Sequence, residues 1–158
     1  GERPQNFDDE CRMVVEMIQQ VWTNRNLAAM REYFHRDVIL HTIGDRTVVR
    51  PKAYQEDLLN LVSPFPGCAF EIRDLQANYG VRYGGLRVAV TWKLSGEYKG
   101  IAHYGPLTGQ PVNILGVSQF QIVNGKIVRE TRVFDWVGVI SQIEAGRSDE
   151  TYVFNNLY

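Results

Sequence analysis

The apolar residues of this chain change their spacing near residue 68, and this change limits the folds open to it. Before residue 68 they recur every three or four positions, which is the spacing of a helix with one buried face. After it they alternate with polar residues, which is the spacing of a strand. Helices followed by a run of strands predict an α+β fold in which the helices cover one face of a sheet.

Three helices are predicted before residue 68. The first lies behind Asp8 or Asp9, either of which suits an N-cap, and carries one apolar stripe: Val14, Met17, Ile18, Val21 and Trp22. The second is short, follows Asn26, ends near Asp37, and has one apolar face: Leu27, Met30 and Phe34. The third begins at Pro51, since proline is favoured at the first helical position, and its apolar face comprises Tyr54, Leu58, Leu61 and Val62.

Five strands are predicted. A short one over residues 38–43 ends at Gly44, between the second and third helices, and four longer ones span residues 68–79, 86–94, 112–123 and 127–135. Gly84-Gly85 and Asn124-Gly125 mark hairpin turns because these residues tolerate positive φ. We therefore expect an antiparallel sheet that curves into a cone, whose open end would become a pocket. The segment 97–111, rich in glycine and proline, is expected at the rim of that pocket.

The length and charge of the chain indicate one domain without a polyanionic partner. A chain of 158 residues can build a core without disulfides, and we expect a single domain over residues 8–144. A flexible N-terminal segment (1–7) and a C-terminal tail (145–158) would flank it. The 17 Lys and Arg residues nearly balance the 18 Asp and Glu residues. Because no basic stripe exists, nucleic acid and membrane partners are not expected.

The compartment is inferred from apolar stretches and cysteines. No apolar stretch approaches the ~20 residues that a bilayer-spanning helix needs, and the N-terminal residues lack the layout of a signal peptide. We therefore expect a cytoplasmic protein. Cys11 and Cys68 lack the spacing of a zinc or redox site and are expected to be free buried thiols.

Several short motifs follow one another along the chain. An aromatic strand entry spans 34–41 and ends in a histidine, and Trp92 lies in a strand of valine and alanine. The run 100–112 carries His103 between two glycines, and the run 124–135 ends in Asp135. In this order the motifs resemble the SnoaL-like polyketide cyclases of the nuclear-transport-factor-2-like superfamily, over residues from about 14 to 143.

The resemblance implies a cone-shaped, cystatin-like α+β barrel in which a curved antiparallel sheet packs on three N-terminal helices. It also implies an enclosed apolar pocket, no metal, no organic cofactor, and a homodimer or higher homo-oligomer formed through the outer sheet face. Two departures from the family pattern stand out. Thr131 and Arg132 occupy positions where many relatives carry an aromatic and an acidic residue. Gln119 and Gln121 occur where relatives often place His or Arg.

Asp135 matches the family's general acid/base for intramolecular aldol closure of a polyketide ester. A carboxylate enclosed by apolar groups is suited to move a proton near neutral pH. The alternative is that Asp135 caps a short helix over residues 136–142.

Two histidines could assist Asp135. His103 could donate a hydrogen bond to an enolate oxygen, or it could be an exposed loop residue. His41 alternates with Ile39 and Ile43, so it is either a pocket residue or a core imidazole bonded to backbone. Together with Asp135 these histidines share only the residue types of an iron site, not its spacing. No metal site is predicted.

Four residues are predicted to contact a ligand. Trp92 is either core or the aromatic wall of the pocket. Arg132 could bind a ligand carboxylate, although an ion pair on the outer surface is the favoured interpretation. Gln119 and Tyr33 could each supply one polar contact, or they could simply pack.

The leading hypothesis is a cofactor-free enzyme of the polyketide or ester cyclase type, using general acid/base chemistry on an apolar carbonyl substrate. One alternative is a non-catalytic ligand-binding or oligomerisation module, which would be favoured by an Asp135 bonded to helix N–H groups and turned from the cavity. Another is an isomerase, dehydratase or epoxide hydrolase, which would need two acids in the pocket.

Overall fold

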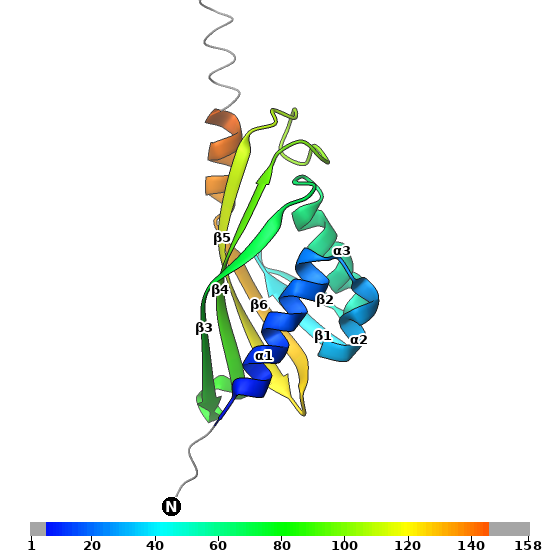
Figure 1. Ribbon diagram of the computed structural model, residues 1–158, viewed down its shortest axis with the longest axis vertical. Coiled ribbons are helices and arrows are strands. Elements are labelled where there is room, and N and C mark those ends of the chain that lie inside the picture. Colours follow the sequence, from blue (N-terminus) through cyan, green and yellow to red (C-terminus); the bar gives the residue numbers. More distant parts are fainter. Residues whose placement is uncertain (1–5, 146–158) are drawn as a thin grey trace, which may run out of the picture.

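The computed structural model of the protein describes residues 6–145 (Figure 1). The predicted flexible segment 1–7 and tail 145–158 therefore lie outside the described residues, apart from residues 6, 7 and 145. Helices α1, α2 and α3 lie together on one side of a curved six-stranded sheet (Figure 1). No helix within residues 6–145 is long and apolar enough to cross a membrane.

The first helix, α1, spans Asp8–Met17 and continues as a π-helical segment, η1, over Ile18–Thr23. Its predicted apolar stripe is confirmed, because all five residues are at most 2% exposed. The predicted cap is wrong. Phe7 occupies the N-cap position, and Asp8 and Asp9 lie in the first turn. There their charges favour the positive end of the helix dipole.

The second helix is shorter than predicted. A 3-10 turn, η2 (Leu27–Ala29), leads into α2 (Met30–Tyr33), and strand β1 already begins at Phe34 and extends to Thr42. Phe34 pairs with Ile127 of the last strand. Pairing with a strand far away in the sequence therefore overrides the local helical spacing at this point.

Helix α3 spans Arg50–Val62 with Pro51 in its first turn, as predicted. It follows β2 (Arg46–Val49), which pairs antiparallel with β1. The predicted apolar face is buried, and the same face also buries Asp57.

The four long strands are β3 (Ala69–Gly80), β4 (Gly85–Glu97), β5 (Pro111–Val123) and β6 (Lys126–Phe134). They pair antiparallel in sequence order, and Asn124 and Gly125 both have positive φ in the β5–β6 turn, as predicted. The sheet order is β2-β1-β6-β5-β4-β3, so the sheet is open, with β2 and β3 at its edges. The register of β3 shifts between Ile72 and Asp74.

One strand pairing departs from the predicted antiparallel sheet. Strand β1 lies beside β6 and runs parallel to it, with Leu40 opposite Glu130 and His41 opposite Thr131. Alternating residues indicate which segments are strands, but they carry no information about the direction of a partner 90 or more residues away. The sheet is therefore mixed.

The interior of the cone is filled by aromatic side chains. Trp22 and Trp92 meet edge to face with ring centroids 5.8 Å apart, and Phe70 packs 5.5 Å from Trp92. Gly116 lies opposite Trp92 in the sheet, and a Cβ atom there would overlap the indole ring. Glycine at this position therefore lets the indole lie flat across β5. One cavity lies at the mouth of the cone, and another lies between α2, the start of β1 and α3.

The mouth is bordered by the predicted rim segment and by a helix over residues 136–145. Tyr98 is fully buried; its hydroxyl donates to the Gly105 carbonyl oxygen and accepts the Tyr104 N–H at 2.9 Å. The Gln142 amide extends β5, since its oxygen accepts the Asn113 N–H at 2.8 Å and its nitrogen donates to the Asn113 carbonyl at 2.9 Å. The Tyr98 bonds thus hold the rim segment together, and the Gln142 bonds attach the helix to β5.

Candidate functional site

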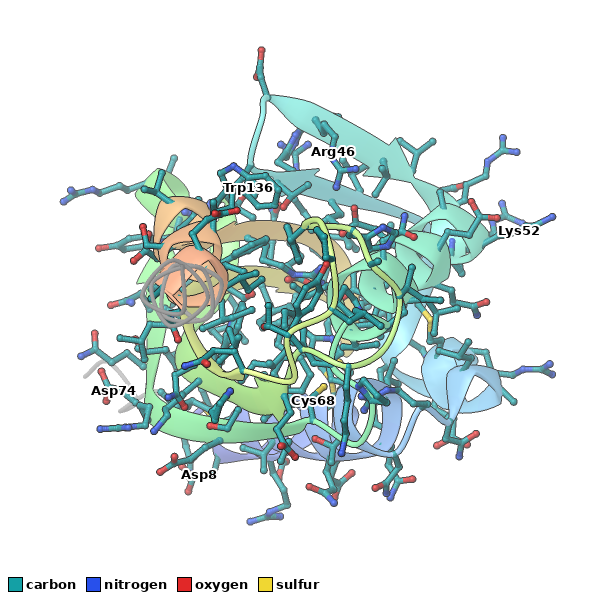
Figure 2. The ribbon with its side chains drawn as sticks, turned by 90° about the horizontal axis from the view of Figure 1, so that it is seen from above. Asp8, Arg46, Lys52, Cys68, Asp74 and Trp136 are labelled. Carbon is teal, nitrogen blue, oxygen red and sulfur yellow. The ribbon has the colours of Figure 1, made fainter. Side chains whose placement is uncertain are left out.

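A cleft of about 500 Å³ opens at the mouth of the cone. Five parts of the chain border this mouth cleft: the β1–β2 hairpin, α3, the rim segment, the end of β6 and the start of the C-terminal helix. Its lining residues are Thr42, Ile43, Gly44, Arg46, Asp57, Asn60, Leu61, His103, Tyr104, Phe134 and Trp136. Figure 2, seen from above, shows Arg46 and Trp136 on the same side of this end. Aromatic and aliphatic walls with a few charged groups are typical of small-molecule sites.

Asp57 connects the mouth cleft to the interior. Its Oδ2 accepts a hydrogen bond from Nη1 of Arg132 at 3.1 Å, and its Oδ1 accepts one from Nη2 of Arg46. The side chains of Asp57 and Arg132 are 7% and 1% exposed, whereas that of Arg46 is 54% exposed. The Asp57 carboxylate therefore accepts one hydrogen bond from a buried guanidinium in the interior and one from a half-exposed guanidinium at the cleft.

A buried polar cluster lies below Asp57. We define it as Tyr54, Asp57, Ser118, Glu130 and Arg132, each at most 8% exposed. Arg132 donates from Nε to Oε2 of Glu130 at 2.8 Å and from Nη2 to Oε1 at 3.2 Å, which is a bidentate pair. Ser118 donates to Oε2 of Glu130 at 2.9 Å, and Tyr54 donates to Oε1. The Glu130 carboxylate thus accepts four hydrogen bonds.

Both interior tryptophans support this cluster through their ring nitrogens. Nε1 of Trp22 donates to the Tyr54 hydroxyl at 3.2 Å, and Nε1 of Trp92 donates to Oγ of Ser118 at 3.1 Å. The Arg132 guanidinium lies over the Trp22 ring, 5.0 Å from its centroid, which is a cation–π contact. The cluster is therefore packed and hydrogen bonded on all sides, as buried charges require.

The protonation states follow from these contacts. Burial alone lowers the pKa of Arg132, but the charge of Glu130, the hydrogen bond to it and the charge of Asp57 outweigh burial and raise that pKa. Arg132 therefore stays cationic. Burial, and then the charge of Glu130, raise the pKa of Tyr54 well above its usual value. Tyr54 remains a neutral phenol and donates a hydrogen bond to Glu130.

Of the predicted catalytic residues, His103 lines the mouth cleft. It is exposed, and its ring packs edge to face with Tyr104, with centroids 6.4 Å apart. The ring of Tyr104 in turn packs against that of Trp136, another lining residue of the cleft, with ring centroids 5.1 Å apart. The Tyr98 hydroxyl fixes the backbone directly after His103, because it bonds the Tyr104 N–H and the Gly105 carbonyl oxygen.

Asp135 does not line the mouth cleft. It is exposed, and its Oδ1 accepts the Gly138 N–H at 2.8 Å, which is the helix-capping arrangement given above as one of two alternatives. The backbone N–H of Asp135 donates to the Leu115 carbonyl at 3.2 Å. The cap fixes the start of the C-terminal helix and so places Trp136 in the cleft wall.

The remaining predicted residues lie apart from the cleft. His41 shares a hydrogen bond of 2.9 Å between its Nδ1 and Oγ1 of Thr47, across the β1–β2 pair. Gln119 accepts a hydrogen bond from Arg87 at 2.9 Å. Tyr33 is buried at the end of α2. The structure therefore does not bring His41, His103 and Asp135 together, and among residues 6–145 no group of metal-ligating side chains gathers.

The favoured surface position of Arg132 is wrong, because Arg132 is 1% exposed and pairs with acids inside the molecule. Trp92 is likewise fully buried and belongs to the core, beneath the cluster, with its ring 6.3 Å from that of the cleft residue Phe134. Both residues act on the cleft only through their neighbours.

Sequence reasoning missed the two acids, Asp57 and Glu130. Glu130 lies two positions from Arg132 and four from Phe134, so all three share a strand face. An opposite-charge pair on the face that also carries Phe134 was the available signal for a buried ion pair. Asp57 lies three positions from Tyr54 and four from Leu61, on the apolar face of α3.

The comparisons with known proteins agree with this architecture. The family of SnoaL-like polyketide cyclases matches residues 12–143. A candidate SnoaL-like polyketide cyclase from Jannaschia sp. CCS1 is 16% identical, with 92% of this chain and 99% of that chain covered and a TM-score of 0.76. A candidate polyketide cyclase from Acidithiobacillus ferrooxidans is 20% identical over 92% and 99% of the two chains, with a TM-score of 0.73.

An epoxide hydrolase described as LEH-like, from M. tuberculosis, is 13% identical over 91% of this chain and 96% of its own, with a TM-score of 0.63. At these identities the structural likeness shows the fold, and it confirms the predicted curved-sheet α+β architecture. No curated protein matches the chain significantly.

Proposed function

Because the chain belongs to the SnoaL-like polyketide cyclase family, we propose that it is a cofactor-free enzyme that moves a proton on a small apolar carbonyl compound in the mouth cleft. The observation that carries this proposal is Asp57. Among the described residues that line the cleft it is the one carboxylate, and it accepts hydrogen bonds from two guanidinium groups. An ionised carboxylate beside apolar walls is a suitable acceptor for a proton next to a carbonyl.

The other lining residues have complementary roles in this proposal. His103 would donate a hydrogen bond to the enolate oxygen that forms when the proton leaves. Phe134 and Trp136 would hold the apolar body of the substrate. Asp135 would position the helix that carries Trp136, and its own participation in proton transfer stays a prediction. His41 would support the β1–β2 turn through Thr47.

Two alternatives each have a supporting observation. Hydration, isomerisation or epoxide opening would need two acids in the cleft; Arg132 joins Asp57, which lines the cleft, to a second carboxylate, Glu130, which is fully buried. The capping arrangement of Asp135 supports a non-catalytic binding module.

The proposal also includes association of two copies through the outer sheet face. Val117 of β5 lies opposite Val133 of β6, and Leu115 is two positions along the same face. Leu115 and Val133 are 56% and 53% exposed. Exposed apolar side chains gathered on one face favour a protein partner over solvent.

Proton transfer can be tested with ethyl benzoylacetate, an apolar β-keto ester. Exchange of its α protons in D₂O is followed by ¹H NMR at a pD where the buffer reaction is slow. The protein should accelerate the exchange, and Asp57→Asn should reduce this acceleration by about 100-fold. Asp74→Asn is the matched control, because Asp74 is exposed on β3 and lies away from Arg46 in Figure 2.

The outcomes separate the candidate functions. Binding of the ester without faster exchange would support the non-catalytic module. If Asp57→Asn accelerated the exchange as much as the unmodified protein and Asp135→Asn did not accelerate it, the proton acceptor would be Asp135 and not Asp57. His103→Gln, compared with His35→Gln as a control for an exposed histidine, reports on stabilisation of the enolate.

A further inference from the structure

The ion pair between Arg46 and Asp57 is asymmetric. The Arg46 side chain is 54% exposed at the mouth cleft, whereas Asp57 is 7% exposed and faces a second guanidinium, that of Arg132. Within residues 6–145, Asp57 is the one hydrogen-bond partner of the Arg46 guanidinium. A half-exposed arginine is screened by solvent and gains little from such a pair.

Release of Arg46 would leave Asp57 with its hydrogen bond from Arg132, whose single positive charge it shares with Glu130. Nη1 of Arg132 would still donate to Oδ2 of Asp57 at 3.1 Å, and Arg132 is itself fixed by two hydrogen bonds to Glu130. The bond to Arg46 is made by the other carboxylate oxygen, Oδ1. Asp57 therefore has one oxygen held by the interior and one whose partner can leave.

Arg46 is also the only Lys or Arg among the residues that line the mouth cleft. It lies where β2 begins, directly after the tight turn formed by Gly44 and Asp45, both of which have positive φ. Beside it the lining is aliphatic or aromatic at Ile43 and Phe134. A planar guanidinium next to apolar walls matches a flat carboxylate attached to an apolar body.

We propose that Arg46 is a latch that exchanges Asp57 for the carboxylate of an apolar ligand. The cleft would then select carboxylic acids with a flat apolar body. The exchange would also uncover Oδ1 of Asp57 at the moment when the ligand arrives. This inference deepens the proposed function and rests on its premise that the mouth cleft is the ligand site.

The test compares two probes of the same size and apolar body by isothermal titration calorimetry: 2-naphthoate, which carries a carboxylate, and 2-naphthamide, which carries a neutral amide in its place. The unmodified protein should bind naphthoate at least 10-fold more tightly than naphthamide at low salt, and high salt should reduce the preference. Arg46→Gln should bring the two affinities within about twofold of each other. Arg36→Gln is the matched control, because Arg36 is an exposed arginine outside the cleft that also pairs with an aspartate.

A second variant separates a latch from a merely structural arginine. Asp57→Asn removes the competing anion, so Arg46 should be freer and naphthoate should bind more tightly than to the unmodified protein. A purely structural role for Arg46 would give weaker binding or none. Arg46→Lys should keep part of the preference, since the charge remains but the bidentate geometry is lost.

The possible failures are distinguishable. Equal binding of the two probes, a preference that survives Arg46→Gln, or weaker naphthoate binding by Asp57→Asn would overturn the latch and leave the proposed function standing. Failure of the unmodified protein to bind either probe would overturn both the latch and the assignment of the mouth cleft as the ligand site. Circular dichroism of each variant verifies that it is folded.

Discussion

Glu130 and Arg132 lie two positions apart on β6, and their side chains meet on its inner face through hydrogen bonds of 2.8 and 3.2 Å. Both are at most 1% exposed. Because Arg132 also bonds Asp57 at the cleft, this pair connects the packed interior to the mouth. Charges this deeply buried are stable only while both partners are present.

Replacing Glu130 by Gln should therefore destabilise the protein strongly. Arg132 would lose its bidentate partner, and the Tyr54 and Ser118 hydroxyls would lose an ionised acceptor. We expect the free energy of unfolding, measured by urea denaturation, to fall by about 3 kcal/mol. Glu71→Gln, at an exposed glutamate on β3, should change it by less than about 0.5 kcal/mol. A loss below 1 kcal/mol in Glu130→Gln would show that the pair is not energetically important.

The capping role of Asp135 predicts a difference between two substitutions. Serine also caps helices, so Asp135→Ser should keep most of the stability, whereas Asp135→Ala should lower the free energy of unfolding by about 1 kcal/mol. Thermal unfolding of both variants measures this. Equal stability of the two would contradict capping by the side chain. In the exchange assay, Asp135→Ser should remain active if Asp57 is the proton acceptor.

Stability should fall at high pH because of Tyr54. Burial, and then the charge of Glu130, raise its pKa in the folded protein, whereas in the unfolded chain it titrates near about 10. Above that pH the unfolded state loses a proton that the folded state retains, so the free energy of unfolding decreases as pH rises. Tyr33 and Tyr104, whose pKa values are raised first of all by burial, add to this trend.

Tyr54→Phe removes one of these titrations, so its unfolding free energy should decline less steeply above about pH 10 than that of the unmodified protein. Urea denaturation of both proteins at several pH values between about 9 and about 11 measures this pH dependence of the unfolding free energy. An unchanged slope would mean that Tyr54 ionises alike in both states.

The proposed association of copies through the outer sheet face predicts that Leu115→Glu yields a monomer. A charge on an apolar interface would have to be desolvated, which weakens the complex. Sedimentation velocity at several concentrations measures the assembly state. Val81→Glu is the control, since Val81 is fully exposed in the β3–β4 turn, outside this face. A monomeric unmodified protein would contradict the proposed assembly.

Repeating patterns allowed the main elements to be predicted from the sequence. The stripe from Val14 to Trp22 and the alternation in β4 each report directly on which side of an element is buried. The Asn124-Gly125 turn was equally predictable, because the positive φ that it requires depends only on these two residues. These features depend only on residues close together in the chain.

The candidate site was harder to predict because its contacts connect distant residues. Tyr54 and Glu130 are separated by 76 positions, and only the parallel pairing of β1 with β6 brings α3 over the last strand. Arg132 was expected outside because charged side chains are seldom buried unless paired. Its partners were present in the sequence, but nothing local indicated that Asp57 would face it.

The open edge of β3 has a consequence for behaviour at high concentration. An edge strand offers unpaired amide and carbonyl groups to which another chain could add. Here that edge is interrupted by the irregularity around Arg73 and bears the charges of Glu71 and Asp74. Bulges and charges on an edge strand hinder its pairing with the strand of another molecule. The β3 edge should therefore resist edge-to-edge aggregation in a crowded solution.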